Sequence, residues 1–125
     1  MISTQNAPSP VIDVYPATVK SWLDSDDVVV IDVREPFERV VESLPETIHH
    51  PVSRLDCQDL VRRYGDQPIC FYCRTGRRSA QVAARYAKRR AELYAAESPE
   101  TSPEKSPELE LPVSHLAGGL EGWKA

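Results

Sequence analysis

Two short runs of apolar residues limit what this chain can fold into more than any other feature of its sequence. Val28–Ile31 and Ile69–Tyr72 each place four apolar side chains in succession. A strand with one solvent-exposed face alternates apolar and polar residues, whereas a strand buried on both faces is apolar throughout. The two runs therefore predict short strands inside a sheet that has helices packed on both of its faces.

The segments around these runs alternate between strand and helix patterns along the chain. The other predicted strands are Val11–Val14, a brief strand around Ile48, and Pro112–Leu116. The predicted helices begin at Pro16, follow Pro36, and span Ser53 to Tyr64, Ser79 to about Ala96, and Leu120 to Trp123. Such an order predicts an α/β fold with a central, mostly parallel five-stranded sheet flanked by helices.

The chain length of 125 residues predicts one domain rather than two. Residues 1–9 are mostly small and polar, which predicts a flexible tail before a domain at 10–125. Residues 97–108 repeat a four-residue pattern with Ser-Pro-Glu in every copy. Regular proline forbids a helix and the segment has no apolar residue to bury, so a disordered insertion is expected at about 97–110. A docking or Ser-Pro modification role is the alternative for this segment.

Charge and hydropathy argue against several classes of partner. The net charge is −4, and residues 97–110 hold five Glu and one Lys, so the remainder balances at 14 basic and 14 acidic residues. A neutral folded part predicts no nucleic-acid partner. No stretch approaches the ~20 apolar residues of a membrane span, and residues 1–10 lack the pattern of a signal peptide. We therefore expect a cytoplasmic protein without a membrane partner.

The cysteines and histidines indicate neither a disulfide framework nor a metal site. Three cysteines cannot all pair, and in a reducing compartment free thiols are expected. The three histidines do not recur at ligand spacings with a cysteine pair, so no metal is expected. Cys70 and Cys73 form a C-x-x-C, which is the pattern of a redox pair. Positions i and i+3 of a strand, however, face opposite sides about 10 Å apart, which favours Cys70 as a core residue.

The segment that follows the second apolar run carries the clearest chemical pattern. After a strand and before a helix, a polar loop can turn its backbone N–H groups toward one point, which the positive end of the helix dipole also faces. Gly76 supplies the conformational freedom for such a curl. Sites of this kind lower a cysteine pKa from ~8.5 into the range ~3.5–7.5, so Cys73 is predicted to be a nucleophilic thiolate. Three neighbouring basic residues add positive charge: Arg74, Arg77 and Arg78.

Roles without a catalytic function remain open for the same residues. Cys73 is an inert core cysteine in the simplest alternative, although a glycine and three arginines are unusual neighbours for a core side chain. Arg77 or Arg78 points outward in another, as part of a solvated helix start.

Three segments of the sequence resemble the rhodanese-domain sulfurtransferases. The loop of that family commonly runs Cys-Arg-x-Gly-x-Arg-Ser, and here it reads Cys73-Arg74-Thr75-Gly76-Arg77-Arg78-Ser79. Val30–Glu35 resembles the Asp-Val-Arg strand end of the family, and Leu116–Trp123 resembles its closing Gly-Gly and Trp segment. The resemblance covers roughly residues 10–125 apart from the insertion. One departure is Glu42–Thr47, where the family usually has Gly-His-Ile-Pro-Gly-Ala and only the proline remains.

This resemblance implies a transfer of sulfane sulfur in two steps. Cys73 would attack the outer sulfur of a small anionic donor such as thiosulfate and keep it as a persulfide, which a thiol or cyanide acceptor then removes. Asp32 and Arg34 would support the loop or rim the pocket, and no cofactor or metal is implied. The residues implied to hold donor and persulfide are Arg74, Thr75, Gly76, Arg77, Arg78 and Ser79.

Two other functions fit parts of the same pattern. A non-turnover rhodanese module for protein interaction, or for sulfur relay with a relay protein as its partner, would carry the same loop. Cysteine phosphatases and arsenate reductases also use a cysteine loop that closes with an arginine. The phosphatase loops place five residues between cysteine and arginine, whereas four residues separate Cys73 from Arg78 and the next position is Ser79. We therefore favour sulfur transfer.

Overall fold

The structure, a computed structural model, describes residues 11–97 and 111–124. The tail expected at 1–9 lies outside the described residues, as does the expected insertion apart from residue 97, with which a helix ends. No helix in the described ranges is both long and apolar enough to cross a membrane.

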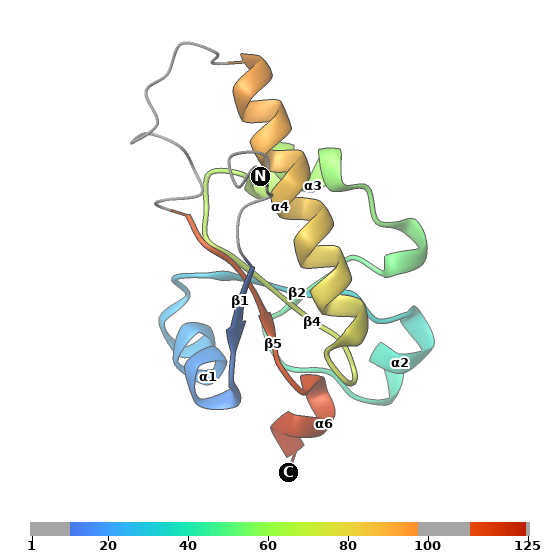
Figure 1. Ribbon diagram of the computed structural model, residues 1–125. Coiled ribbons are helices and arrows are strands. Elements are labelled where there is room, and N and C mark those ends of the chain that lie inside the picture. The colour runs from blue at the N-terminus through green and yellow to red at the C-terminus, as the bar shows by residue number, and fades with distance from the viewer. Residues whose placement is uncertain (1–10, 98–110, 125) are drawn as a thin grey trace, which may run out of the picture.

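Five short strands form one sheet at the centre of the molecule (Figure 1). Every pairing between them is parallel, in the order β1-β5-β4-β2-β3. Every residue of the central strands β4 and β5 is buried, as expected for a parallel sheet with covered faces. The predicted five-stranded sheet is thereby confirmed. Its strands are β1 (Val11–Val14), β2 (Val29–Asp32), β3 (Ile48–His49), β4 (Ile69–Tyr72) and β5 (Val113–Leu116).

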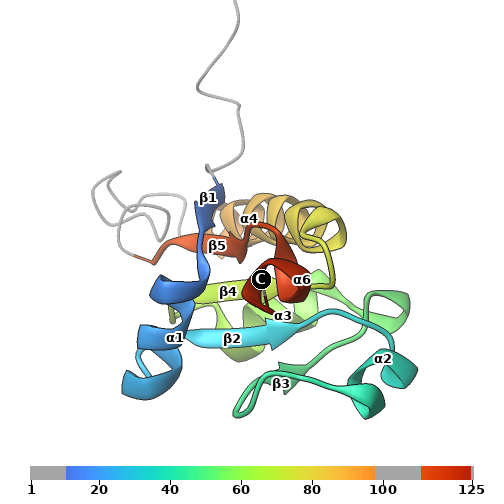
Figure 2. The same cartoon turned by 90° about the horizontal axis from the view of Figure 1, so that it is seen from below.

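Helices cover the two faces of this sheet (Figure 2). One core cluster joins the sheet to α3 (Cys57–Tyr64) and α4 (Arg77–Glu97), and a second joins it to α1 (Pro16–Ser25) and α6 (Gly119–Lys124). Side chains alternate between the clusters along β4, so Cys70 belongs to the second and Cys73 to the first. The remaining helix, α2 (Pro36–Val41), follows β2.

The helix expected from Ser53 to Tyr64 is interrupted in the structure. A 3-10 turn, η2 (Val52–Arg54), comes first, and α3 begins only at Cys57. The break occurs at Asp56, whose carboxylate accepts hydrogen bonds from the backbone N–H groups of Gln58 and Asp59, at 3.0 and 3.4 Å. An aspartate in this position caps a new helix and ends the preceding turn.

The helix α4 begins at Arg77, two residues before the expected start at Ser79. The segment between β4 and α4 is therefore only four residues long, and Ser79 is already in the first turn of the helix. This shift brings the backbone N–H groups of the helix start close to Cys73.

Candidate active site

Cys73 directly follows β4, and the chain after it curls back around the sulfur atom. The backbone N–H of Gly76 donates a hydrogen bond to Cys73 Sγ at 3.1 Å, and that of Ser79 donates another at 3.3 Å. The Ser79 hydroxyl oxygen lies 3.5 Å from the same sulfur. The curl requires Gly76 to adopt a φ of 99°, which residues with a side chain rarely adopt. The backbone amides of this loop thus converge on one atom.

The turn after β5 holds the other side of the loop backbone. Leu120 N–H donates to the carbonyl oxygen of Cys73 at 2.8 Å, and Glu121 N–H donates to that of Arg74 at 2.9 Å. A Cβ on Gly119 would lie 2.5 Å from the Arg74 carbonyl, so only glycine allows this approach. Because α6 takes up these carbonyl groups, the loop is fixed with its N–H groups free to face the sulfur.

This environment favours the ionised form of Cys73. Burial of the thiol raises its pKa, because a charge is less stable away from water. Hydrogen bonds from the Ser79 hydroxyl and from the backbone N–H groups of Ser79, Gly76 and Thr75 outweigh burial and hold the pKa below the ordinary value of a cysteine. The site can therefore present a thiolate, which is the nucleophilic form of cysteine.

Arg78 is held by the carboxylate of Glu38, which no sequence motif marks as part of the site. Its Nη1 and Nη2 atoms donate to the two carboxylate oxygens of Glu38, each at 2.8 Å. The hydrogen bonds from Arg78 are the main reason why the pKa of Glu38 falls to about 2, so the pair stays charged at neutral pH. Glu38 also accepts from the backbone N–H of Glu35 at 2.8 Å in the capping box of α2. The capping pattern is visible in the sequence, but the pairing with a residue 40 positions away is not.

The other predicted residues of the loop occupy different environments. The Arg74 side chain is exposed, 3.6 Å from the carboxylate of Glu121. Arg77 and Thr75 are exposed as well. The structure therefore brings Gly76, Ser79 and the Thr75 amide to the sulfur, and leaves the Arg74 and Arg77 side chains toward solvent.

Asp32 organises the neighbouring strand end from a fully buried position. Its carboxylate accepts three hydrogen bonds from Arg34, at 2.9, 3.1 and 3.0 Å, one from Arg39 at 2.9 Å and one from the Tyr72 hydroxyl at 3.0 Å. Burial raises the pKa of Asp32, but the hydrogen bonds and charge of Arg34 lower it further than burial raises it. Asp32 therefore acts as an anchor, while Arg34 reaches the cavity described below.

The segment Glu42–Thr47 is fixed by side chains although it lacks the expected glycines and histidine. The Leu44 N–H donates to the Tyr72 hydroxyl at 3.2 Å. Arg39 donates to the Thr47 carbonyl oxygen at 2.9 Å and to its hydroxyl at 3.1 Å. These contacts tie the segment to the Asp32 network and so shape the rim of the site.

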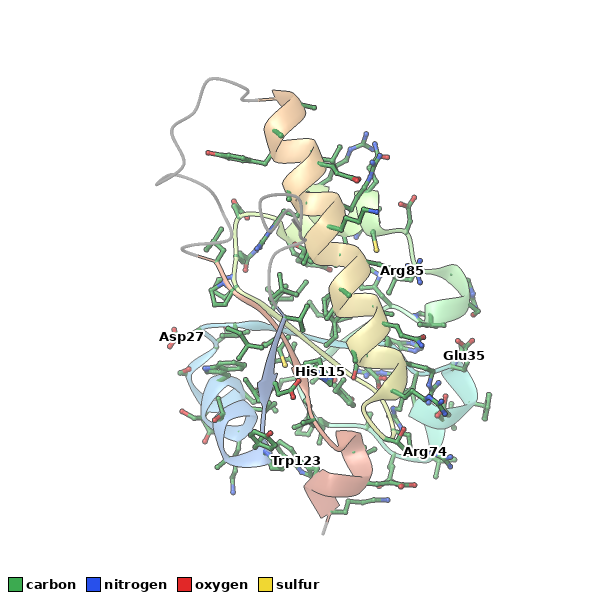
Figure 3. All side chains as sticks on the ribbon, viewed as in Figure 1. Asp27, Glu35, Arg74, Arg85, His115 and Trp123 are labelled. Carbon is green, nitrogen blue, oxygen red and sulfur yellow. The ribbon has the colours of Figure 1, made fainter. Side chains whose placement is uncertain are left out.

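A cavity of about 610 Å³ opens beside the loop. Residues of α2, the loop and α6 line it, including Phe37, Glu38, Val41, Arg74, Arg78 and Leu120. Figure 3 labels Glu35 and Arg74, which both line it and lie on the same side of the molecule. Each cation of the lining has a carboxylate partner, and these pairs are Arg34–Asp32, Arg74–Glu121, Arg78–Glu38 and Lys124–Glu42. The lining is therefore close to charge-balanced, unlike the strongly positive loop that the sequence suggests.

Comparison with known proteins places this arrangement in a family. Residues 15–125 match the family model of the rhodanese-like domain. The chain belongs to the rhodanese-like domain family. The resemblance drawn from three sequence motifs is thereby confirmed, and the matched range contains the whole Cys73 loop and the closing Gly-Gly segment.

One curated relative and two solved structures show distant similarity to this rhodanese-like domain. The uncharacterized protein slr1261 of Synechocystis sp. is 26% identical over 113 residues, which cover 90% of this chain and 52% of that protein. The chain thus spans about half the length of this relative. The human single-domain sulfurtransferase TSTD1 has a similar structure, with 19% identity, a TM-score of 0.52 and coverage of 92% of this chain and 96% of the human one. The As-Sb reductase of Leishmania major has 19% identity, a TM-score of 0.63 and coverage of 91% and 77%. These structural likenesses show the fold alone.

Proposed function

We propose that this rhodanese-like domain is a sulfurtransferase that carries sulfane sulfur as a persulfide on Cys73. The observation that carries the proposal is the convergence of the Gly76 and Ser79 N–H groups on Cys73 Sγ, at 3.1 and 3.3 Å. A sulfur atom held by amides is stabilised when it bears negative charge, both as a thiolate and as the terminal sulfur of a persulfide that takes its place. The reaction needs a negative sulfur at each of these stages.

The first step transfers one sulfur atom from the donor. The Cys73 thiolate attacks the outer sulfur of thiosulfate and forms a new S–S bond. The S–S bond of thiosulfate breaks, and sulfite leaves with its electron pair. Among the cations that line the cavity, Arg78 lies in the first turn of α4, and its charge interacts with that of Cys73. We assign it the role of holding the anionic donor.

The second step releases the sulfur to an acceptor. Cyanide or a thiolate attacks the outer sulfur of the persulfide, and the S–S bond to Cys73 breaks. The electron pair returns to Cys73, which leaves as a thiolate held again by the loop amides. A low pKa for Cys73 therefore helps this residue both as the nucleophile in the first step and as the leaving group in the second.

Three free cysteines fit a reducing compartment such as the cytoplasm.

Thiocyanate formation from thiosulfate and cyanide tests this function. We expect the wild-type chain to produce thiocyanate and to gain the mass of one sulfur atom on Cys73 when cyanide is left out. Cys73→Ser should lose both, whereas Cys57→Ser, which changes a partly buried cysteine of α3, should keep both.

Other outcomes would favour the alternatives. A persulfide on Cys73 that forms from a protein or small-molecule persulfide but never turns over with cyanide would support a relay module. If no persulfide forms, and the chain instead hydrolyses an aryl phosphate or reduces arsenate, the sulfurtransferase proposal is wrong.

A further inference from the structure

A line of hydrogen-bonding groups connects the buried sulfur of Cys73 with the protein surface. The Ser79 hydroxyl oxygen lies 3.5 Å from Cys73 Sγ and 3.1 Å from His115 Nδ1. The other ring nitrogen of His115, Nε2, lies 2.9 Å from a carboxylate oxygen of Asp13. Cys73 and Ser79 are fully buried and His115 is 7% exposed, whereas the Asp13 side chain is 61% exposed. The line thus runs from the core to solvent.

We propose that His115 is a positioning residue that takes up the thiol proton of Cys73 through Ser79 and turns the Ser79 hydroxyl toward the sulfur. The proposal rests on the role of Cys73 as the reacting group, which is part of the proposed function. The proton path uses Ser79, the last residue of the loop motif on α4, and two residues outside the motif, His115 on β5 and Asp13 on β1.

The proton transfer is balanced along this line. In the thiol form, Cys73 S–H donates to the Ser79 oxygen, the Ser79 O–H donates to His115 Nδ1, and His115 Nε2–H donates to Asp13. When the thiol ionises, its proton passes to the Ser79 oxygen and the former hydroxyl proton passes to Nδ1. The products are a Cys73 thiolate that accepts from the Ser79 hydroxyl and a protonated His115 that donates to Ser79 and to Asp13.

The surroundings of Ser79 explain why the state of His115 matters. The hydroxyl has one proton and three acceptors within reach, because the Gly76 carbonyl oxygen lies 3.3 Å away in addition to Cys73 Sγ and His115 Nδ1. With an unprotonated Nδ1, the hydroxyl proton is drawn toward the histidine. A protonated Nδ1 is no longer an acceptor, so the hydroxyl can donate to the negative sulfur, which is a stronger acceptor than a neutral carbonyl.

The neighbours of His115 on β1, β4 and α4 include one negative charge that can stabilise its protonated form. Asp13 is the register partner of His115 on β1, and on the other side the partner on β4 is Phe71, which is uncharged. From α4, Ser79 faces the ring, and Arg78 is the cation whose charge interacts with Cys73. Glu38 on α2 faces Arg78 and not the histidine. Asp13 is therefore the charged group placed to stabilise a protonated His115.

The pH dependence of Cys73 alkylation tests the proposal without relying on sulfur transfer. Alkylation of the Cys73 peptide by iodoacetamide is followed by mass spectrometry between pH 5 and 10. His115→Asn keeps a hydrogen-bonding side chain beside Ser79 but cannot accept a proton. We expect the midpoint of the rate profile to rise by about one pH unit in this variant. In a Ser79→Ala background, His115→Asn should cause no further shift, because the connection is already lost.

Asp13→Asn keeps the test decisive if His115→Asn does not fold, because Asp13 is largely exposed. If the only effect of Asp13→Asn were the loss of a negative charge, the Cys73 thiolate would become more stable and the midpoint of alkylation would fall. Loss of support for a protonated His115 would raise it, so the sign separates the two effects. Asp24→Asn, on the exposed side of α1, is the matched control and should leave the midpoint unchanged.

Three results would overturn the proposal. They are an unchanged midpoint in folded His115→Asn, an equal shift in the presence and absence of the Ser79 hydroxyl, and a lowered midpoint in Asp13→Asn. Normal alkylation shifts together with an absence of thiocyanate formation would instead leave the role of His115 intact and contradict only the sulfurtransferase function.

Discussion

Two cysteines, three residues apart, show that burial alone does not set the pKa of a thiol in this protein. Cys70 and Cys73 are both 0% exposed. Burial raises the pKa of Cys70 to about 12, although a hydrogen bond with Ser114 opposes the shift. At Cys73 burial also raises the pKa, but hydrogen bonds from the loop outweigh it and the result is a pKa below the ordinary value. Desolvation acts on both sulfur atoms, so the hydrogen bonds from the Ser79 hydroxyl and from the backbone N–H groups around Cys73 make the difference.

The difference follows from where each cysteine lies relative to the end of β4. Cys70 is within the strand, where the register with β2 and β5 engages the neighbouring backbone groups. Cys73 lies beyond the strand, next to the first turn of α4. The first N–H groups of a helix have no partner inside the helix, and the earliest backbone bond here runs from Ala80 N–H to the Gly76 carbonyl. Donors that the helix cannot use are thus available to the sulfur of Cys73.

The largest expected effect compares the two thiols in one molecule. At pH 7 a pKa of about 12 leaves about one Cys70 in 100,000 ionised, whereas the hydrogen bonds that lower the pKa of Cys73 leave a far larger fraction of that thiol ionised. The lower basicity of Cys73 makes each thiolate less nucleophilic, which reduces the advantage. We expect Cys73 to be alkylated at least about 50-fold faster than Cys70. Peptide mass spectrometry after iodoacetamide treatment measures both rates together.

The profile against pH sharpens the same comparison. The midpoint of Cys73 alkylation should lie below that of an ordinary cysteine, whereas alkylation of Cys70 should still rise at pH 10. Parallel profiles for the two cysteines would show that the hydrogen bonds from the Ser79 hydroxyl and the backbone N–H groups do not shift the Cys73 pKa.

A second, smaller effect comes from loosening the loop through α6. Gly119→Ala places a Cβ 2.5 Å from the Arg74 carbonyl at a φ of 60°, so the backbone contact has to open. We expect a loss of about 2–3 kcal/mol in the free energy of unfolding and at least tenfold slower persulfide formation. Gly122→Ala is the matched control, because its Cβ would make only an ordinary 3.7 Å contact. Denaturant unfolding and persulfide mass measure the two properties, and equal behaviour of the variants would contradict the role of Gly119.

The comparison also shows what the sequence could and could not reveal. The sheet, the family and the sulfur-facing curl follow from consecutive residues: an apolar run, a glycine and a helix start. The pairing of Arg78 with Glu38 and of Ser79 with His115 joins residues 40 and 36 positions apart, and no local pattern records such pairs. The break of the expected helix at Asp56 was accessible in principle, because aspartate is a frequent N-cap residue. The assignment of substrate-binding residues stays a prediction.

A moderate effect is expected from freeing the arginine of the site. Glu38→Gln keeps an acceptor for the Glu35 N–H but removes the charge that neutralises Arg78. The cavity then gains net positive charge, and a dianionic donor should bind more tightly. We expect the KM for thiosulfate to fall about threefold to tenfold with little change in kcat. Steady-state thiocyanate formation measures both, with Glu92→Gln on α4 as an exposed control. A higher KM would mean that Glu38 serves mainly to orient Arg78.

The smallest expected effect is that of Arg77→Ala, which tests whether side-chain charge or hydrogen bonding lowers the pKa of Cys73. Arg77 is exposed at the first position of α4, where water and salt screen its interaction with the buried sulfur. Arg77→Ala should therefore move the midpoint of Cys73 alkylation by less than about 0.3 pH unit, although the sequence suggests three arginines acting together on the thiol. The same alkylation profile measures it, with exposed Arg54→Ala on η2 as the matched control. A rise of a full unit would mean that diffuse positive charge, rather than the Gly76 and Ser79 N–H groups, distinguishes Cys73 from Cys70.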